Sequence, residues 1–314
     1  MGPTLSLVIP AHNEATHIES SLRTILRDVD AVDPSSEVIV VDDGSNDETW
    51  NVVRRLSQLE PRVRAIRLSR RFGKEAAICA GLMQVRGLAV IVMDSDLQHP
   101  PALIPQMYKA WRDEGCDVVE AVTSNRDSRS WSADRGGRLF YTLFRRLSNM
   151  DLGNATDFKL MDRRVVDAWA QLPERTTFFR GMSAWTGFRR RQIPMTVPTR
   201  AGGRSQWSAL QLMGLAVDSI TSFSAVPVYL IPLAGLLFFI FGAALALQSL
   251  YYKLEGSGRE GFPTVIIVQV VLGSVLLFSL GIIGQYIVKI YDEVKARPRF
   301  IVAESTDTEV SHPD

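Results

Sequence analysis

The sequence predicts an α/β domain with a mostly parallel sheet, followed by two helices that cross a membrane. Over the first 125 residues, short apolar segments alternate with amphipathic segments, the pattern of parallel strands joined by crossover helices. Beyond residue 225 come two long apolar stretches, each long enough to span a bilayer. The mean hydropathy of +0.05 hides this division, because it averages two unlike parts.

The first part of the chain reads as strand and helix in turn. The expected strands are Leu5–Pro10, Glu37–Val41, Val63–Leu68, Leu88–Met93 and Asp117–Val122. The expected helices are Ala15–Val29, Asp47–Leu59, Lys74–Arg86 and Pro101–Glu114. Ligands of such sheets bind at the carboxyl ends of the strands, where the polar clusters of this sequence also fall. Residues 1–204 are therefore the predicted catalytic domain.

The second part of the chain is predicted to contact the membrane. Residues 205–225 are expected to form an interfacial amphipathic helix, and spans are expected at about 226–250 and 264–288. One such apolar run would also suit a buried core helix, but two runs joined by a short loop favour a transmembrane hairpin. Residues 289–314 are expected to be a tail, and Ala303–Asp314 is predicted to be solvated. A further amphipathic helix is expected at Arg135–Asn149.

Charge distribution predicts the orientation of this hairpin. Basic residues flank it on both sides: Arg189, Arg190, Arg191, Arg200 and Arg204 precede it, and Lys289, Lys295, Arg297 and Arg299 follow it. The positive-inside rule then places the catalytic domain and both termini in the cytosol, at the plasma or inner membrane. The formal net charge of +1 gives no indication of a nucleic-acid partner.

The sharpest chemical signal is Asp94-Ser95-Asp96, directly after an apolar strand. Two carboxylates one residue apart at a strand end can hold a divalent cation that also grips a diphosphate. Such a triplet alone is weak evidence, because acids often end strands. Its place after the fourth strand of the series strengthens the interpretation, and Gln98 follows in a polar turn.

Three more polar clusters follow the first three strands. Pro10–Glu14 comes after the first strand, and Asp42-Asp43-Gly44 comes after the second, where a carboxylate can accept from a base N–H. A turn and helix cap would also explain acids at this place, although two adjacent acids exceed that need. Arg70–Lys74 leads into a helix, and cations at a helix N-terminus form an anion site.

Together these clusters resemble the inverting nucleotide-sugar glycosyltransferases of family two, which have the GT-A fold. The stretch Leu68–Pro101, the motif Asp157–Arg163 with Leu172–Arg175 after it, and Gly284–Arg299 resemble the polyprenyl-phosphate glycosyltransferases. That group includes dolichol-phosphate mannose synthase and the GtrB-type bacterial enzymes. The similarity extends over nearly all of residues 4–300, and the motifs are specific in combination.

The resemblance implies roles for individual residues. The nucleotide-sugar site would comprise Pro10, Ala11, Asn13, Glu14, Asp42, Asp43, Arg71, Lys74, Asp94, Ser95, Asp96 and Gln98. Asp94 and Asp96 would bind Mg²⁺ or Mn²⁺, and Asp96 and Asp157 would be catalytic, the latter as a base or as an orienting group. The acceptor phosphate would meet Arg126, Arg200, Arg204, Ser205 and Gln206.

Two positions depart from the family pattern. The family usually has lysine where Gln206 stands, which removes one expected partner of the phosphate. It often has an arginine near Ala121–Thr123 that is absent here, and Arg126, Arg129 or Arg204 are the candidates to replace it.

The implied reaction is transfer of a hexose to polyprenyl phosphate with inversion, giving a lipid-linked sugar for the cell envelope. UDP-glucose is the favoured donor; GDP-mannose, UDP-galactose, a UDP-N-acetylhexosamine or a modified arabinose stay open. Relatives with two spans form tetramers, so the resemblance also implies a homotetramer. A processive polysaccharide synthase is less favoured, because its further motif and additional spans are not seen. The intact Asp94, Asp96 and Asp157 argue against a non-catalytic scaffold.

Overall fold

The structure is a computed structural model that describes residues 3–123, 155–171, 179–180, 186–195, 226–255 and 262–307. The chain forms two compact units. One comprises Met1–Arg145, Met150–Ser205 and Pro298–Asp314, and the other comprises Arg146–Asn149 and Gln206–Arg297. The helices expected at 135–149 and 205–225 lie outside the described residues.

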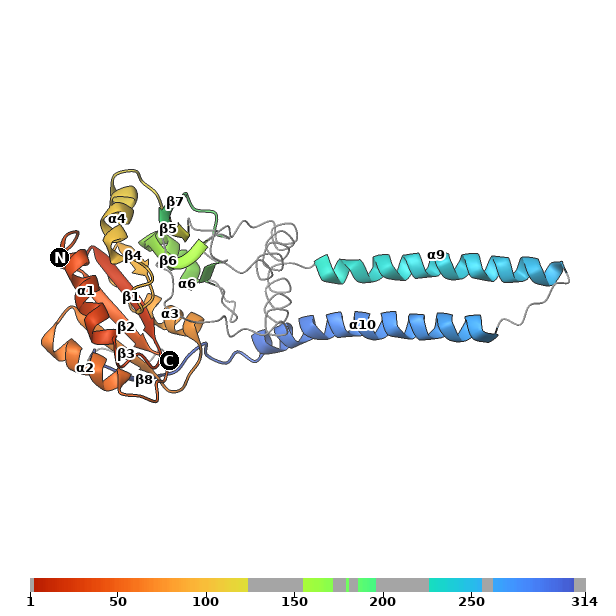
Figure 1. The fold of residues 1–314 in the computed structure, drawn as a ribbon, viewed down its shortest axis with the longest axis horizontal. Coiled ribbons are helices and arrows are strands. Elements are labelled where there is room, and N and C mark those ends of the chain that lie inside the picture. Colours follow the sequence, from red (N-terminus) through yellow and green to blue (C-terminus); the bar gives the residue numbers. More distant parts are fainter. Residues whose placement is uncertain are drawn as a thin grey trace. The chain divides into compact units, whose positions relative to one another are not determined.

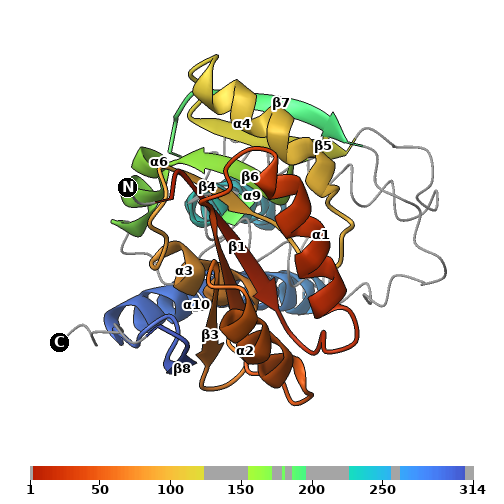
Figure 2. The same cartoon turned by 90° about the vertical axis from the view of Figure 1, so that its left-hand side faces the viewer.

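The described residues of the first unit form an eight-stranded sheet in the order β7-β5-β6-β4-β1-β2-β3-β8 (Figures 1 and 2). Its strands are β1 Leu5–Ala11, β2 Glu37–Asp42, β3 Val63–Leu68, β4 Ala89–Val92, β5 Val118–Thr123, β6 Ala155–Asp162, β7 Arg190–Met195 and β8 Val302–Ser305. Neighbouring strands among β1 to β4 pair in parallel, which confirms the predicted sheet. Two strands run against this direction: β6, between β4 and β5, and β8, beside β3.

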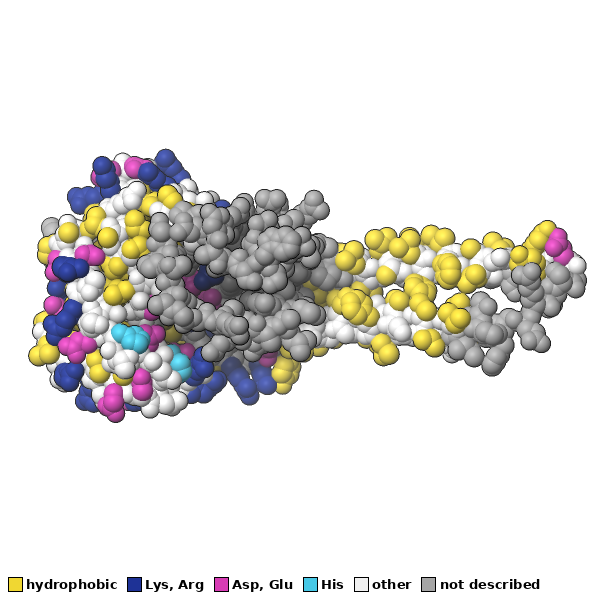
Figure 3. Space-filling model, in the orientation of Figure 1, with side chains coloured by type: hydrophobic (Ala, Val, Ile, Leu, Met, Phe, Trp, Pro, Cys, Tyr) yellow, Lys and Arg dark blue, Asp and Glu magenta, His cyan; other side chains and the backbone are white. Residues whose placement is uncertain are grey.

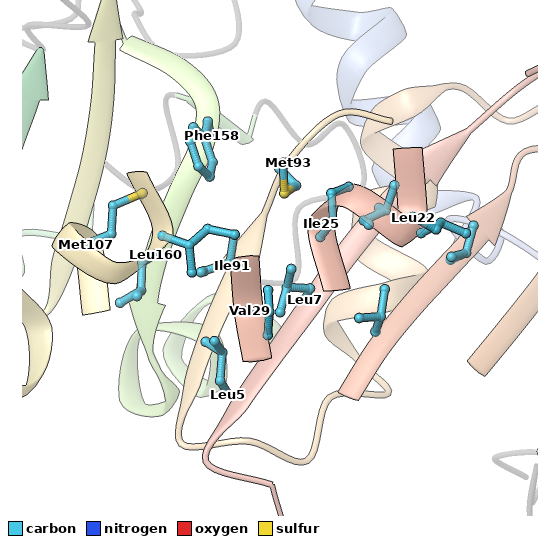
Figure 4. Close-up of a cluster of buried hydrophobic side chains, with 14 of the residues drawn as sticks. Leu5, Leu7, Leu22, Ile25, Val29, Ile91, Met93, Met107, Phe158 and Leu160 are labelled. Carbon is cyan, nitrogen blue, oxygen red and sulfur yellow. The ribbon is translucent and has the colours of Figure 1, made fainter. Parts of the chain in front are cut away.

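Helices connect these strands as the alternating pattern predicts. They are α1 Ile18–Asp30, α2 Thr49–Leu59, α3 Lys74–Leu82, α4 Ile104–Arg112 and α6 Arg163–Ala170, with a short 3₁₀ turn at Pro101–Leu103 before α4. On one face of β1, Leu5 and Leu7 join a buried cluster with Leu22, Ile25 and Val29 of α1 (Figure 4). On the other face α3 packs closely on the sheet, since a Cβ on its Gly81 would lie 2.3 Å from Val8 Cγ1.

The antiparallel strand β6 brings a distant acid to the ligand-binding edge. Its register pairs Ala89 with Asp162 and Val92 with Lys159. Continued by two residues, this register sets Asp157 opposite Asp94 at the carboxyl end of β4. The two carboxylates reach one site through strand pairing, although 62 residues of sequence lie between them.

The C-terminal segment corrects one expectation. We expected a solvated tail from Ala303 to Asp314, whereas Val302–Ser305 forms the edge strand β8. Side chains secure it to the sheet: Glu304 accepts from the Trp50 indole at 3.1 Å and from Arg67 at 3.0 Å. These positions have a solvated appearance because Glu304–Glu309 are all polar, and an edge strand accommodates polar and charged side chains.

Breaking the end of β8 is expected to destabilise the first unit by about 2 kcal/mol. The Thr306 N–H donates to the Ala65 carbonyl at 2.9 Å, and its hydroxyl accepts from the Ala65 N–H at 2.8 Å. Thr306→Pro removes both bonds, whereas the control Thr306→Val removes only the second. Thermal unfolding in detergent should rank the wild type above the valine variant and the proline variant last. Equal midpoints for all three proteins would contradict this role of β8.

The second unit contains two long helices that lie side by side, α9 Val226–Leu254 and α10 Phe262–Val294 (Figure 1). Both are longer than the predicted spans, and their apolar side chains are exposed along their length (Figure 3). The stretches Val228–Leu245 and Ile267–Val294 are apolar and long enough to cross a membrane. Such an apolar pair, unburied by the rest of the described chain, is compatible with a membrane hairpin.

Candidate active site

The loops after β1 and β2 interlock at the carboxyl edge of the sheet. The Asn13 N–H donates to Ser45 Oγ at 2.9 Å, and the Asn13 side-chain oxygen accepts from the Asn46 N–H at 2.9 Å. The next residue, Glu14, donates its N–H to Thr49 Oγ1 at 2.8 Å. Asn13 has a φ of 57°, a left-handed conformation that asparagine adopts more readily than most residues. The loop is therefore held rigidly where a nucleoside is expected.

The two acids after β2 have different surroundings. Asp42 is 1% exposed, and its Oδ1 accepts from the Ser45 N–H at 3.0 Å. Its Oδ2 is buried without a hydrogen-bond donor among the described residues, 3.5 Å from the Arg67 guanidinium. Asp43 accepts from the N–H groups of Phe72 at 2.7 Å and Gly73 at 2.8 Å. Asp42 thus lies buried beside Arg67 at the end of β2, whereas Asp43 positions the loop before α3.

Gly44 lets that loop approach closely. A Cβ at Gly44 would lie 2.4 Å from the carbonyl carbon of Arg70, and the glycine has a φ of 60°. Any side chain would displace the loop and be strained as well. Through Asp43 and Gly44, the end of β2 determines where Lys74, the first residue of α3, enters the site.

The acidic triplet after β4 forms a tight turn. Asp96 is exposed, and its Oδ1 accepts from the Gln98 N–H at 3.0 Å. His99 is buried, stacks on Phe158 at 5.4 Å, and accepts from the Asp94 N–H at Nδ1. Burial lowers the pKa of His99, so the imidazole is neutral with its proton on Nε2. His99 therefore shapes the turn that carries both aspartates.

A chain of charges joins α3, β4 and β6. The Lys74 ammonium lies 2.5 Å from Asp94 Oδ1 and 2.7 Å from Asp157 Oδ2. Arg180 donates two bonds to the Asp157 carboxylate, at 2.7 and 2.9 Å. Such a paired arrangement is the strongest geometry for arginine and carboxylate. Asp157 is thus held by two cations, and Lys74 is shared by two acids.

These contacts determine the protonation of the site. Burial by itself raises the pKa of Asp157, but Arg180 and Lys74 outweigh it and hold that pKa well below its usual range. Burial lowers the pKa of Lys74, and the carboxylates of Asp94 and Asp157 reverse that effect, so the net shift is upward. At neutral pH the carboxylate is ionised and the amine is charged. An acid held in this way is a poor proton acceptor.

A buried ion pair between β5 and β6 lies next to the same region. Lys159, two residues from Asp157 on β6, is 0% exposed, and Glu120 opposite it on β5 is 1% exposed. The Lys159 ammonium lies 3.1 Å from Glu120 Oε1 and donates to the Arg180 carbonyl at 3.4 Å. The pair thereby links the sheet to the segment that carries Arg180.

Glu75 connects α3 to the same segment. Its Oε2 accepts from the Phe179 N–H at 2.8 Å. Burial raises the pKa of Glu75 to about 7, and the negative charge of Asp157 adds to that rise, while the Phe179 N–H, Arg180 and Lys74 oppose it. Glu75 of α3 is therefore bonded to the residue that precedes Arg180, the partner of Asp157.

The raised pKa of Glu75 predicts a pH-dependent stability. The folded protein binds the Glu75 proton more tightly than the unfolded chain does. The stabilisation from this proton is therefore fully present below pH 4.5 and is lost as pH rises to about 7. Between pH 5 and 8 the free energy of unfolding of Glu75→Gln should rise relative to that of the wild type by about 1–3 kcal/mol, measured by unfolding in detergent. Glu19→Gln is the control, since Arg23 and Arg55 lower the pKa of Glu19 out of this window. A difference between Glu75→Gln and wild type that stays constant with pH would contradict the prediction.

Most of the predicted site is described and lies at one edge. These residues lie in the last positions of β1 and β2, in the segments that follow β1 to β4, or on β6 beside β4. They are Pro10, Ala11, Asn13, Glu14, Asp42, Asp43, Arg71, Lys74, Asp94, Ser95, Asp96, Gln98 and Asp157. The proposed acceptor residues Arg126, Arg200, Arg204, Ser205 and Gln206 lie outside the described residues. Three contributors were not predicted: Arg180, Glu75 and Lys159. Their roles come from pairing across the fold: Glu75 and Lys159 lie inside segments that carry the family resemblance, but only the structure shows their contacts, and Arg180 lies in none of those segments.

The acids of the site suit a divalent cation that is bound jointly with a ligand. Carboxylate oxygens are the ligands that Mg²⁺ and Mn²⁺ prefer, and Asp94 already attracts the Lys74 ammonium. Within the described part of the chain, no group of three or more His, Cys, Asp or Glu side chains is arranged to hold a metal. An ion at Asp94 and Asp96 would therefore take its remaining ligands from water or a diphosphate.

Comparison with known proteins agrees with this arrangement. The family model "Glycosyl transferase family 2" matches residues 6–169. An uncharacterized glycosyltransferase of Synechocystis is 36% identical over 305 residues, covering 96% of this chain and 95% of its own. A bactoprenol glucosyl transferase from a Shigella flexneri prophage is 34% identical, covering 96% and 98% respectively.

Among solved structures, a Pyrobaculum calidifontis mannosyltransferase in complex with GDP-Man and Mn²⁺ aligns with 89% of this chain and 88% of its own. Its identity is 19% and the TM-score is 0.43, so the family assignment does not depend on it. That assignment is carried by the matched domain and by relatives that align along nearly the whole chain. With its acids at the strand ends of a GT-A sheet, the chain belongs to glycosyltransferase family 2 and is a glycosyltransferase.

Proposed function

We propose that this enzyme transfers glucose from UDP-glucose to a polyprenyl phosphate, with inversion at the anomeric carbon. The observation that carries the proposal is the shared Lys74, which joins Asp94 of the donor edge to Asp157. Relatives named bactoprenol glucosyl transferase, 32–34% identical along 95–96% of this chain, support the choice of sugar and acceptor. The two apolar helices support a substrate that resides in a membrane.

On the donor side, the chain supplies a rigid cradle. Asn13 and Glu14 lie in the interlocked loop, and Asp42 lies at the end of β2, where its neighbour Ser45 also bonds Asn13. Asp94 and Asp96 would hold Mg²⁺ or Mn²⁺, which when bound neutralises charge on the departing diphosphate. Arg71 and Lys74, at the entry to α3, add positive charge beside the same phosphates.

On the acceptor side, the nucleophile is a phosphate oxygen that is already anionic at neutral pH. It needs no proton removed, and Asp157 is ill suited to remove one because Arg180 and Lys74 stabilise its charge. We therefore assign Asp157 an orienting role. It holds Arg180 at the site, where this cation attracts the acceptor phosphate and aligns its oxygen with the anomeric carbon.

The hairpin gives this chemistry its location. A polyprenyl chain stays in the bilayer, so a tethered active site meets the phosphate at the headgroup level. The basic flanks of the hairpin favour a cytosolic catalytic domain and cytosolic termini at the plasma or inner membrane. Reporter fusions after residue 255 and after residue 307 test this topology, with an external reporter expected only for the first. The implied homotetramer stays a prediction.

A donor panel with one defined acceptor tests the proposed reaction. Purified protein in detergent receives undecaprenyl phosphate, Mn²⁺ and labelled UDP-glucose, UDP-galactose, UDP-N-acetylglucosamine or GDP-mannose, and the lipid is extracted. UDP-glucose is expected to give the fastest labelling of an extractable glycolipid. Faster labelling from another donor would show that the enzyme transfers that donor's sugar and not glucose. Label in a water-insoluble polymer would indicate a polysaccharide synthase, and no label from any donor would overturn the proposal.

A further inference from the structure

The place of Lys74 poses a problem for metal binding. Its ammonium lies 2.5 Å from Asp94 Oδ1, on the carboxylate that the proposed metal needs. His99, the other neighbour of Asp94, lies farther away, with its Nδ1 3.8 Å from Asp94 Oδ2 and accepting from the Asp94 N–H. Within the described residues, Lys74 is thus the charged partner that neutralises Asp94 before any ion arrives. A divalent cation and this ammonium repel each other, and both cannot occupy one carboxylate oxygen.

The surroundings of Lys74 fix its backbone position and leave its ammonium group able to move. Asp43 binds the N–H groups of Phe72 and Gly73, so the chain enters α3 at a set position. The Lys74 side chain remains 39% exposed, and four methylene groups carry its ammonium. The ammonium can move by a few ångströms without any change in the backbone. Asp157, which is 6% exposed in its side chain, keeps Arg180 as a partner if Lys74 leaves.

We propose that Lys74 is a resident cation that occupies Asp94 and Asp157 until a divalent ion arrives together with the donor diphosphate. The inference rests on the metal role proposed for Asp94 and Asp96. With no diphosphate, an incoming ion gains little, because taking Asp94 leaves the Lys74 ammonium beside the ion with only Asp157, which Arg180 already neutralises. With a diphosphate present, Lys74 transfers to a phosphate oxygen and the ion takes Asp94. Metal binding thereby depends on the nucleotide, and the free enzyme binds the metal weakly.

Binding of Mn²⁺ to the purified full chain tests this exchange without turnover. Electron paramagnetic resonance of free Mn²⁺ gives the affinity with and without saturating UDP. In the wild type, UDP is expected to tighten Mn²⁺ binding about 10-fold. Lys74→Met should bind Mn²⁺ about 10-fold more tightly than wild type without UDP, and UDP should then tighten its binding by a smaller factor than in the wild type, because only ligation by the diphosphate remains. Lys74→Gln, a second neutral variant, is expected to behave in the same way.

The controls separate this exchange from loss of structure or of overall charge. Lys74→Arg keeps the positive charge and should keep the wild-type dependence on UDP. Lys109→Met removes a charge from an exposed position on α4 and should leave both affinities unchanged. A damaged site would bind Mn²⁺ more weakly, so tighter binding by both neutral variants is specific to the proposed exchange. If Lys74→Met and Lys74→Gln bind Mn²⁺ without UDP as the wild type does, or more weakly, the inference is wrong, whereas the proposed metal site is unaffected. No Mn²⁺ binding by the wild type, even with UDP, would overturn both.

Discussion

Asp96→Asn is expected to lose at least about 100-fold in glycosyl transfer while keeping its fold. Asp96 is exposed, and its one hydrogen bond in the described structure, from the Gln98 N–H at 3.0 Å, uses Oδ1. The asparagine oxygen accepts the same bond, so the turn after β4 should persist. What disappears is a negative charge from the pair that is proposed to hold the metal and diphosphate. The rate of labelled glycolipid formation from UDP-glucose measures the loss.

A matched variant distinguishes this effect from a general effect of charge. Asp113→Asn makes the same chemical change at an exposed position beyond the end of α4 and should retain the wild-type rate. Both variants should unfold within a few degrees of the wild type. Transfer by Asp96→Asn within threefold of the wild type, or full wild-type activity in EDTA, would exclude the proposed metal role.

Lys159→Met is expected to destabilise the first unit by about 3–5 kcal/mol, the largest stability effect that we predict. Lys159 and Glu120 are 0% and 1% exposed, and their charged atoms lie 3.1 Å apart. Burial lowers the pKa of Lys159, an effect that Glu120 opposes. Removal of the ammonium leaves Glu120 buried beside Arg190, whose nearest nitrogen is 4.0 Å away. Chemical denaturation in detergent, followed by tryptophan fluorescence, measures the change.

The double variant Lys159→Met/Glu120→Gln tests whether the cost comes from the unpaired charge. It should be more stable than the sum of the two single variants implies, by more than about 1 kcal/mol. Strict additivity would show that Lys159 acts through packing alone. Because Lys159 also donates to the Arg180 carbonyl, even the stabilised double variant should show slower transfer.

The periodic part of the fold was predictable from sequence, and its reason is local. The strands β1, β2 and β4 are mostly apolar runs, and α1, α2 and α4 each show one apolar face, whereas α3 is buried over Ala77–Leu82. Differences occur at helix ends: α3 stops at Leu82 instead of Arg86, and a 3₁₀ turn precedes α4. The same local logic placed Asp42, Asp94 and Asp96 at one edge, since parallel strands present their carboxyl ends together.

What the sequence could not predict depends on partners far along the chain. The antiparallel pairing of β6 with β4 places Asp157, which was singled out only through resemblance. Arg180 shows no local pattern, and its role appears once it meets Asp157, 23 residues away. Strand β8 is the extreme case, because Glu304 meets Arg67 over a separation of 237 residues. Hydrophobic periodicity carries no information about such contacts.

Strand β8 also imposes an order of events on biosynthesis. A ribosome produces β3 early and β8 only after both apolar helices, and 237 residues separate Arg67 from Glu304. At about 5–20 residues per second, the outer edge of β3 waits on the order of 10–50 s for its partner. During that time its unpaired N–H and C=O groups can bind another strand. The sheet of the first unit is therefore completed only after both apolar helices have been synthesised.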